Sequence, residues 1–222
     1  MDRETRIRAL WDANAAAWTD AVRGGGIRSR RVATDAAIVE AVLARQPRAV
    51  LDVGCGEGWL ARALAREGVD VLGVDGAPAL IAQAQASGAG RFQVLTQEAL
   101  AEEGLDARFD GVVCNFALFG KTVVERLFAR MPDLLQPRGA LIVQTLHPSA
   151  VDDEGARRDG WRDGSWQGCG DGFGEAPPWY FRTLDGWRQL IEASGMRLIE
   201  YREPSDPADG RPLSLLLIAT PS

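Results

Sequence analysis

The sequence has 222 residues, a length that suits one α/β domain with a small appendage. Its hydrophobic fraction of 46% is ordinary for a globular protein with a core, and its formal net charge is −6. Because the basic residues are scattered and form no Lys/Arg-rich block, a protein that neutralises a phosphate backbone is disfavoured, and we expect no nucleic-acid partner.

Two helices are predicted before the first strand. Apolar residues recur at helical spacing over residues 4–22, at Ile7, Leu10, Trp11, Ala15 and Trp18, and three glycines end that helix. Residues 29–47 predict a second helix that stops before Pro47, because the residue before a proline disfavours helical geometry. We treat residues 1–46 as an N-terminal helical cap.

Strands and helices then alternate. Strands are expected at 48–54, 69–75, 91–96, 109–116 and 139–146, and helices at 58–67, 77–87 and 121–135. The strands "VLDV", "GVVC" and "LIV" are apolar without alternation, which is typical of a parallel sheet buried on both faces. Repeated strand–helix units predict a three-layer, doubly wound α/β sheet.

The alternation fails from His147 to Arg182, a stretch rich in Gly, Pro and Trp. A loop of that length is typically a lid or a binding loop, so residues 148–182 predict a lid-like substrate insert. A helix follows, with Thr183 as its N-cap and Gly195 at its C-terminus. Residues 196–204 and 211–220 predict two antiparallel strands. The expected result is one domain, 1–222, with seven strands, mostly parallel and with an antiparallel C-terminal strand.

Three glycines alternate directly after the first strand, in "DVGCGEG" with Asp52, Gly54 and Gly56. Glycines let a backbone pass close to a ligand, and helix N-terminal amides favour negative groups. Dinucleotides and S-adenosylmethionine (SAM) both use such a corner. The dinucleotide spacing puts Trp59 where a third glycine is required, and Asp52 would repel a pyrophosphate, which favours SAM. Asp75 ends the next strand, where an acid can accept hydrogen bonds from ribose hydroxyls, a feature shared with NAD sites.

The stretches "VLDVGCGEGWLARAL" and "VDVLGVDGAPALIAQA" resemble the first two motifs of the class I SAM-dependent methyltransferases, which have a Rossmann-like fold. "GVVCNFALF" and "PRGALIVQTLHP" resemble their fourth- and fifth-strand motifs, so the resemblance spans about Arg48 to Pro148. The flanks resemble a bacterial subgroup related to quinone-biosynthesis and small-acid methyltransferases. The N-P-P-Y-type signature of nucleic-acid amino-methylating enzymes is absent, because the matching stretch is "NFALF".

The resemblance implies a role for each matching residue. Asp52, Gly54 and Gly56 would lie along the methionine part of SAM, and Cys55 would contact it through its backbone. Asp75 would take the ribose hydroxyls and Gly76 would lie beside the adenosine. Gln97 or Glu98 would face the adenine amine. Asn115 and Phe116 would line the methyl-transfer pocket. For Trp18, a position over the cofactor and a position in the core both stay open.

His147 is the only histidine and follows the predicted fifth strand, at the ligand-binding edge. Its usual pKa suits a general base near neutral pH, and the alternative is a turn residue before Pro148. We expect methyl transfer from SAM to an oxygen, nitrogen or carbon of a small molecule. The alternatives are an NAD(P)-dependent oxidoreductase and a non-catalytic SAM-binding regulatory protein.

Cysteine spacing and the N-terminus complete the expectations. Cys55, Cys114 and Cys169 form no C-x-x-C pair, so we expect neither a metal site nor a disulfide framework. The N-terminal stretch lacks the apolar core of a signal peptide, and no apolar run reaches the length of a membrane span. These features predict a cytoplasmic protein with no membrane span.

Overall fold

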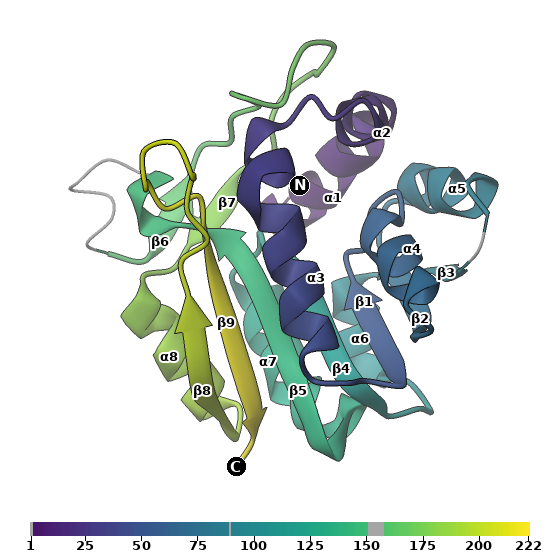
Figure 1. The fold of residues 1–222 in the computed structure, drawn as a ribbon, viewed down its shortest axis with the longest axis vertical. Helices are drawn as coiled ribbons and strands as arrows, with labels where there is room; N and C mark the ends of the chain where they lie inside the picture. The colour runs from purple at the N-terminus through teal and green to yellow at the C-terminus, as the bar shows by residue number, and fades with distance from the viewer. Residues whose placement is uncertain (1, 89, 151–157) are drawn as a thin grey trace.

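A single mixed sheet organises the molecule (Figure 1). The computed structural model describes residues 2–88, 90–150 and 158–222. The main sheet of these residues has seven strands in the order β3-β2-β1-β4-β5-β9-β8. The strands are β1 Ala49–Val53, β2 Asp70–Asp75, β3 Arg91–Val94, β4 Phe109–Asn115, β5 Leu135–Leu146, β8 Met196–Arg202 and β9 Ser214–Pro221. The neighbouring pairs from β3 to β5 are parallel, and β9 runs antiparallel to both β5 and β8. The predicted sheet is confirmed.

Helices cover both faces of this sheet. They are α3 Asp35–Leu43, α4 Trp59–Arg66, α5 Pro78–Ala86, α6 Gln97–Glu103, α7 Thr122–Leu134 and α8 Leu184–Ala193. One buried cluster joins α3 and α4 to one face, and another joins α6, α7 and α8 to the opposite face. Strand β9 shows why the central strands are apolar throughout. Leu215 and Leu217 belong to the second cluster, whereas Leu216 and Ile218 belong to the first.

The N-terminal region differs from the prediction of one helix over residues 4–22. It forms α1, Arg3–Ala13, and α2, Ala15–Arg23, with a break at Asn14. The second predicted helix begins with a π-helical turn, η1 Arg30–Thr34, before α3. A π-helical turn is rare and often marks a functional site. Helices α1 and α2 lie across the upper end of the sheet in Figure 1, where the parallel strands terminate.

Two further elements were not predicted. Helix α6 follows β3 directly, with Thr96 as its N-cap and the Thr96 hydroxyl accepting a hydrogen bond from the Ala99 amide. The predicted insert contains a small antiparallel sheet of β6, Gly160–Arg162, and β7, Trp179–Phe181. A short 3₁₀ turn, η2 Pro148–Ala150, follows β5. Residues 151–157 of the predicted insert lie outside the described residues.

The C-terminal helix follows its predicted capping signals. The Thr183 hydroxyl accepts a hydrogen bond from the Gly186 amide at 3.0 Å, so it caps the first turn of α8. Gly195 follows the helix with φ +73°, a conformation that favours glycine. Pro78 is the first residue of α5, where its fixed φ suits the first helical turn.

Candidate active site

The glycine turn after β1 is folded against β2. The amides of Gly54 and Cys55 both donate to the Val74 carbonyl, at 2.7 and 3.0 Å. Gly54 and Gly56 have φ of +74° and +56°, which other residues adopt only with strain. A Cβ added to Gly54 would overlap the Cβ of Ala117. The turn therefore requires glycine, and it leaves the backbone bare on the side that faces the cavity described below.

Asp75 ends β2 with both carboxylate oxygens fixed. Oδ2 accepts a hydrogen bond from the Gly56 amide at 2.9 Å, and Oδ1 accepts one from the Ala77 amide at 2.8 Å. Burial raises the pKa of this carboxyl, and the two amide bonds oppose that rise. Each carboxylate oxygen can accept more than one hydrogen bond, so this pre-oriented group can still receive two hydroxyl donors from a ligand.

Asp52 lies in β1, just before the glycine turn, with a side chain only 1% exposed. Its Oδ2 has no hydrogen-bond partner among the described residues. Burial, and then the nearby negative charge of Asp75, raise the pKa of Asp52 to about 7. A buried carboxylate without a partner is unfavourable unless it gains a proton or a cation. This end of the site therefore favours a cationic group.

Three further predicted residues stand where β2 and β3 end. A Cβ added to Gly76 would lie 3.2 Å from Cδ of Arg8 and 3.5 Å from the backbone of Thr96, so little room remains there. The Gln97 amide donates to the Ala117 carbonyl at 2.9 Å. Glu98 pairs with Arg8 of α1 at 3.3 Å, which links this edge of the sheet to the N-terminal helices.

Asn115 and Phe116 lie where β4 ends. Gln144 of β5 donates from Nε2 both to Oδ1 of Asn115 at 2.8 Å and to the carbonyl of Thr34, at the end of η1, at 3.0 Å. Phe116 has φ +52°, an uncommon conformation for a bulky residue, and its amide donates to the Gln144 carbonyl at 2.7 Å. Backbone strain of this kind is often found at functional sites.

One cavity of about 910 Å³ connects these residues. Ten of the predicted cofactor residues line it, namely Trp18, Gly54, Cys55, Gly56, Asp75, Gly76, Gln97, Glu98, Asn115 and Phe116. Asp52 is not among its lining residues. The cavity continues beyond β4 to Leu146 at the end of β5 and to Leu213, just before β9. It therefore extends well past the edge formed by the first three strands.

Aromatic rings from distant segments cover this cavity. Trp11 lies 5.1 Å from Trp18, 5.2 Å from Phe119 and 5.2 Å from Trp166, measured between ring centroids. Trp166 also stacks on Phe173 of the insert at 4.4 Å. Aromatic residues in such an insert can wall a pocket or anchor the loop to the domain. Trp166 does both, because it lines the cavity and packs on α1 and α2.

His147 is placed differently from the cofactor residues, because it does not line the cavity. Its Nε2 lies 2.9 Å from Oε1 of Glu203, and its Nδ1 lies 2.9 Å from the hydroxyl of Ser149. The Ser149 amide also donates to Nδ1, so Nδ1 is an acceptor and Nε2 carries the proton in the neutral ring. Ser149 does line the cavity. The histidine therefore reaches the cavity through one hydroxyl, a residue that sequence analysis did not single out.

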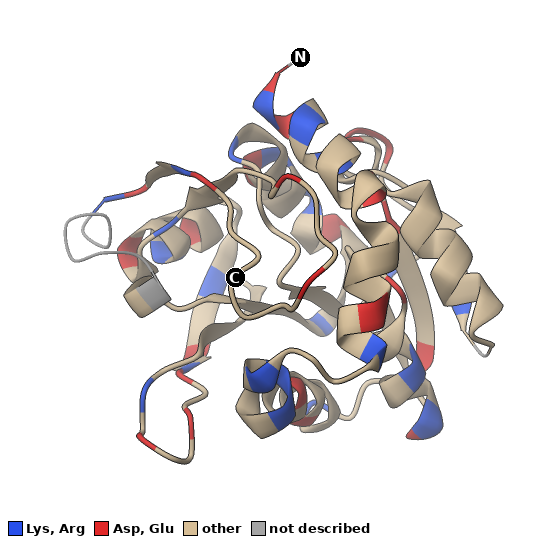
Figure 2. Cartoon of the chain, turned by 90° about the horizontal axis from the view of Figure 1, so that it is seen from above, with Lys and Arg blue, Asp and Glu red and all other residues tan. Residues whose placement is uncertain are grey.

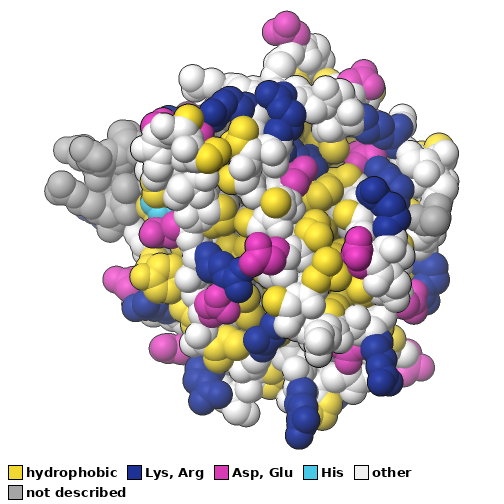
Figure 3. Space-filling view, viewed as in Figure 1, with side chains coloured by type: hydrophobic (Ala, Val, Ile, Leu, Met, Phe, Trp, Pro, Cys, Tyr) yellow, Lys and Arg dark blue, Asp and Glu magenta, His cyan; other side chains and the backbone are white. Residues whose placement is uncertain are grey.

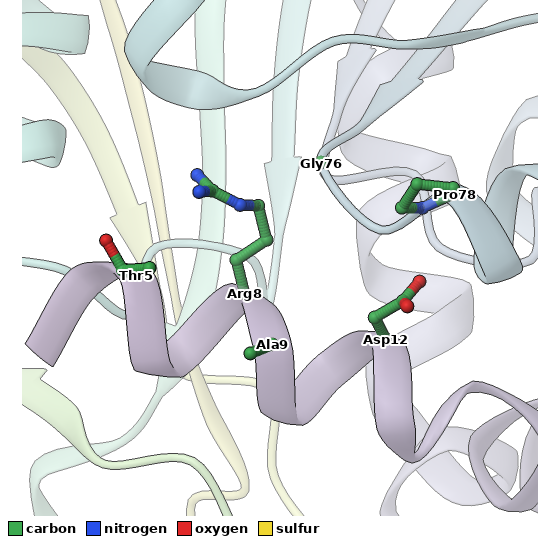
Figure 4. A pocket seen from close by; sticks show the side chains of 6 residues that line it. All are labelled: Thr5, Arg8, Ala9, Asp12, Gly76 and Pro78. Carbon is green, nitrogen blue, oxygen red and sulfur yellow. The ribbon is translucent and has the colours of Figure 1, made fainter. Parts of the chain in front are cut away.

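A smaller cavity of about 270 Å³ adjoins the first at Gly76 and Arg8 (Figure 4). Arg8 and Asp12 rise from α1 toward the turn that holds Gly76 and Pro78. Oδ1 of Asp12 accepts a hydrogen bond from the Ala79 amide at 3.0 Å, near the start of α5. The first helix is thus attached to the turn that carries Asp75.

Charged side chains of both signs are interspersed, both along the chain (Figure 2) and over the face drawn in Figure 3. Among residues 2–88, 90–150 and 158–222, no three His, Cys, Asp or Glu side chains form a group that could hold a metal ion. The three cysteines are free thiols. No described helix is long and apolar enough to cross a membrane.

Residues 50–139 match a protein family described as a methyltransferase domain. Over these residues the chain belongs to the class I SAM-dependent methyltransferases. The chain is 39% identical over 102 residues to a ubiquinone biosynthesis O-methyltransferase of Azorhizobium caulinodans, and the alignment covers 44% of this chain and 40% of that protein. It is 33% identical over 135 residues to an uncharacterized methyltransferase of Mycobacterium tuberculosis, and this alignment covers 60% of the chain and 66% of the relative. The chain thus spans between two fifths and two thirds of these relatives.

Solved structures show the same fold. The 1,6-didemethyltoxoflavin-N1-methyltransferase of Burkholderia thailandensis superimposes with a TM-score of 0.70 at 21% identity, over 99% of this chain and 88% of that one. It was solved with S-adenosylhomocysteine and its substrate bound. The magnesium protoporphyrin IX methyltransferase of Synechocystis PCC 6803, with bound S-adenosylhomocysteine, gives a TM-score of 0.69 at 19% identity over the full length of both chains.

Proposed function

We propose that this methyltransferase binds SAM at the glycine turn and transfers its methyl group to an oxygen, nitrogen or carbon of a small molecule in the same cavity. The observation that carries the proposal is the continuity of that cavity. It joins the glycine turn and Asp75 to the ends of β4 and β5, so one space of about 910 Å³ has room for a donor and an acceptor.

The residues present fit SAM. Gly54 and Gly56 line the cavity in a turn with positive φ, Asp75 offers an oriented carboxylate to two ribose hydroxyls, and the unpaired oxygen of Asp52 favours a cation. SAM carries an ammonium group and supplies a methyl group activated by its sulfonium. Gln97 and Glu98 are the proposed partners of the adenine, and Trp18 covers the cavity from α2.

The protein's own residues have three tasks. The strained turn at Asn115 and Phe116 fixes one wall of the acceptor space, and in-line positioning of two reactants supplies a large part of the acceleration. The aromatic rings around Trp11 and Trp166 exclude water from the cavity. Where the acceptor carries a proton, a base must receive it.

His147 is the proposed base, acting through Ser149. The Ser149 hydroxyl takes the proton of the acceptor and passes its own proton to Nδ1 of His147, while Glu203 holds the opposite ring nitrogen at 2.9 Å. A base held by a third group is a common arrangement in enzymes. Asp163 is another acid that lines the cavity, but it is exposed and belongs to the insert.

The two alternatives make different demands on the site. A nicotinamide oxidoreductase has to place a pyrophosphate beside the glycine turn, where Asp52 disfavours it. A regulatory protein that only binds SAM has no use for the space beyond β4. The match of residues 50–139 to a methyltransferase domain favours methyl transfer over both alternatives.

Calorimetry tests the proposal directly. The protein is titrated separately with S-adenosylhomocysteine, NAD⁺ and NADP⁺, and we expect only the first to bind. Asp75→Ala should weaken this binding by on the order of 1–3 kcal/mol, because ligand hydroxyls lose a charged acceptor. Asp70→Ala is the matched control, since Asp70 is an exposed acid at the other end of β2.

A product assay then separates an enzyme from a regulator. Methyl-labelled SAM is incubated with a panel of phenols, amines and small acids, and labelled product is identified by mass spectrometry. Binding of a nicotinamide nucleotide in place of S-adenosylhomocysteine would overturn the proposal. Tight binding of S-adenosylhomocysteine without any labelled product across the panel would favour the regulatory alternative.

A further inference from the structure

Several arginines line the cavity. Among them are Arg28, Arg30, Arg162 and Arg211, and the acid Asp163 of the insert also lines it. They come from the segment before α3, from β6 of the insert and from the loop before β9. Arg30 begins η1, and Thr34 at the end of η1 is bonded to Gln144 of β5, which also bonds Asn115 at the end of β4. This connects Arg30 to the strand ends where the proposed acceptor binds.

Arg30 is held in place by Asp35 and Trp59. Its Nε donates to both oxygens of Asp35, at 3.0 and 3.2 Å, and its guanidinium lies 4.5 Å from the ring centroid of Trp59. The side chain is only 11% exposed. A stacked and bonded guanidinium keeps its plane fixed, so the direction of its remaining N–H groups is also fixed.

The two terminal nitrogens of Arg30 donate to no described residue, and they are accessible rather than enclosed, although the side chain as a whole is only 11% exposed and lines the cavity. Their N–H groups are therefore available to a ligand. Arg28 differs, because Asp206 already takes two of its nitrogens. Arg162 donates to the carbonyls of Trp161 and Arg158.

We propose that Arg30 binds a carboxylate of the methyl acceptor, so the preferred substrates are small carboxylic acids. The inference rests on the proposed function. Two parallel N–H groups of a guanidinium match the two oxygens of a carboxylate, and a charge-assisted pair of this kind is stronger than neutral hydrogen bonds. The exposed Arg211 at the cavity mouth adds positive charge that attracts an anion.

Arg30 also has a structural role that the test must separate from binding. Its contacts with Asp35 and Trp59 use Nε and the face of the guanidinium, and they hold the start of η1 against α4. The N–H groups of the two terminal nitrogens donate in neither contact. A substitution that lowers stability would lower every affinity, so S-adenosylhomocysteine binding serves as the readout of an intact site.

The experiment titrates anions into the protein saturated with S-adenosylhomocysteine. The probes are benzoate, 4-hydroxybenzoate and succinate, their amides as neutral counterparts, and phenyl phosphate as a second oxyanion. The proteins are wild type, Arg30→Met, Arg30→Lys and the control Arg45→Met, which removes one exposed charge beyond the other end of α3.

We expect at least one carboxylate to bind wild type and Arg45→Met about tenfold or more tightly than its amide. Arg30→Met should remove that preference while S-adenosylhomocysteine affinity stays within about twofold, and Arg30→Lys should restore it only in part, because an ammonium lacks the planar pair of donors. Tighter binding of phenyl phosphate than of any carboxylate would overturn the assignment to carboxylates.

The remaining outcomes are also decisive. If S-adenosylhomocysteine binds wild type but no carboxylate does, or if Arg30→Met keeps the full preference for carboxylate over amide, the inference is wrong and the proposed function stands. If S-adenosylhomocysteine does not bind wild type, the proposed function itself fails.

Discussion

Asp52 combines burial with an unpaired oxygen, and its pKa of about 7 makes its protonation dependent on the ligand. In the free protein at about pH 6.5 the carboxyl is largely protonated. An ammonium group bound nearby favours the carboxylate and lowers that pKa, so donor binding should release up to about one proton. Calorimetry of S-adenosylhomocysteine binding in two buffers of different ionisation enthalpy measures this release, and Asp52→Asn should abolish it.

The same substitution has a predictable effect on stability. The folded-state pKa of Asp52 is raised above the ordinary value of 3.8, so the stability of the ligand-free protein falls as pH rises from about 4 to about 7. Asp52→Asn should therefore raise the free energy of unfolding at about pH 8 by on the order of 1–3 kcal/mol, with little change near pH 4. Denaturation curves of both proteins that stay parallel across this range would contradict the assigned pKa.

Ser149 and His147 act as one unit in the proposed reaction, so their variants should behave alike. Ser149→Ala and His147→Ala should each lower turnover by on the order of 10²-fold once an acceptor is known, and the double variant should cost little more. Affinity for S-adenosylhomocysteine should stay the same, because neither side chain lies near the glycine turn. The measurements are turnover against pH and donor binding on the same preparations.

A matched serine keeps this test specific. Ser194→Ala removes a hydroxyl that donates to the Ile191 carbonyl at the end of α8, away from the cavity, and it should leave turnover unchanged. Normal turnover in Ser149→Ala combined with loss in His147→Ala would show that the proton does not pass through the hydroxyl. Normal turnover in both would return His147 to the role of a turn residue before Pro148.

Among the elements, the break between α1 and α2 attaches the insert to the N-terminal helices. The Asn14 side chain is buried, accepts a hydrogen bond from the Gly174 amide at 2.7 Å and donates to the Glu175 carbonyl at 3.1 Å. Asn14→Ala should remove both bonds and speed amide hydrogen exchange across residues 163–178, with a loss of stability of on the order of 1–3 kcal/mol. It should also weaken S-adenosylhomocysteine binding. The two bonds of Asn14 hold the insert against the N-terminal helices, and Trp166 and Trp18 from these two segments both line the cavity.

An amide on the opposite side of the protein provides the comparison. Gln136→Ala removes an exposed side chain at the start of β5 whose contact with the Arg108 carbonyl spans 3.4 Å, and exchange in the insert should not change. If exchange over residues 163–178 is as slow in Asn14→Ala as in the wild type, the insert is held by its aromatic packing and the asparagine contributes little.

Local signals predicted most of the elements, and contacts between distant segments account for the rest. Apolar strands, the glycine turn and the N-cap at Thr183 are encoded within a few residues, and the sequence alone predicted them. The break at Asn14 was missed because its partners, Gly174 and Glu175, lie 160 residues along the chain. Strands β6 and β7 have three residues each, too few for a visible period, and they are fixed by pairing with one another.

The residues of the site show the same distinction between local signals and contacts of distant segments. The residues that follow strand ends, such as Asp75 and Asn115, could be placed from the sequence because parallel strands end at a common edge. Arg30 and Ser149 could not be placed at the site from the sequence. Arg30 precedes the first strand, and its environment depends on Trp59 and Asp35, whereas Ser149 gains its importance only from the orientation of the His147 ring.

The whole molecule is needed to close the cavity. Its wall combines the N-terminal helices, the ends of the five strands β1 to β5, the insert and the loop before β9, segments that span residues 4–213. A ligand that fills this space binds only the fully assembled chain, so it stabilises every one of these segments together. Substitutions far from the methyl group, at Asn14 for example, therefore affect donor affinity through the closure of the cavity.

The position of β9 has a consequence for how the protein is made. This strand is inserted between β5 and β8, and its leucines reach the core on both faces of the sheet. During synthesis β5 and β8 are complete before residues 214–221 leave the ribosome, and until then each has an edge without its neighbour. An open apolar edge invites pairing with other chains. The gap between β5 and β8 therefore stays open to other chains until residues 214–221 pair with both strands.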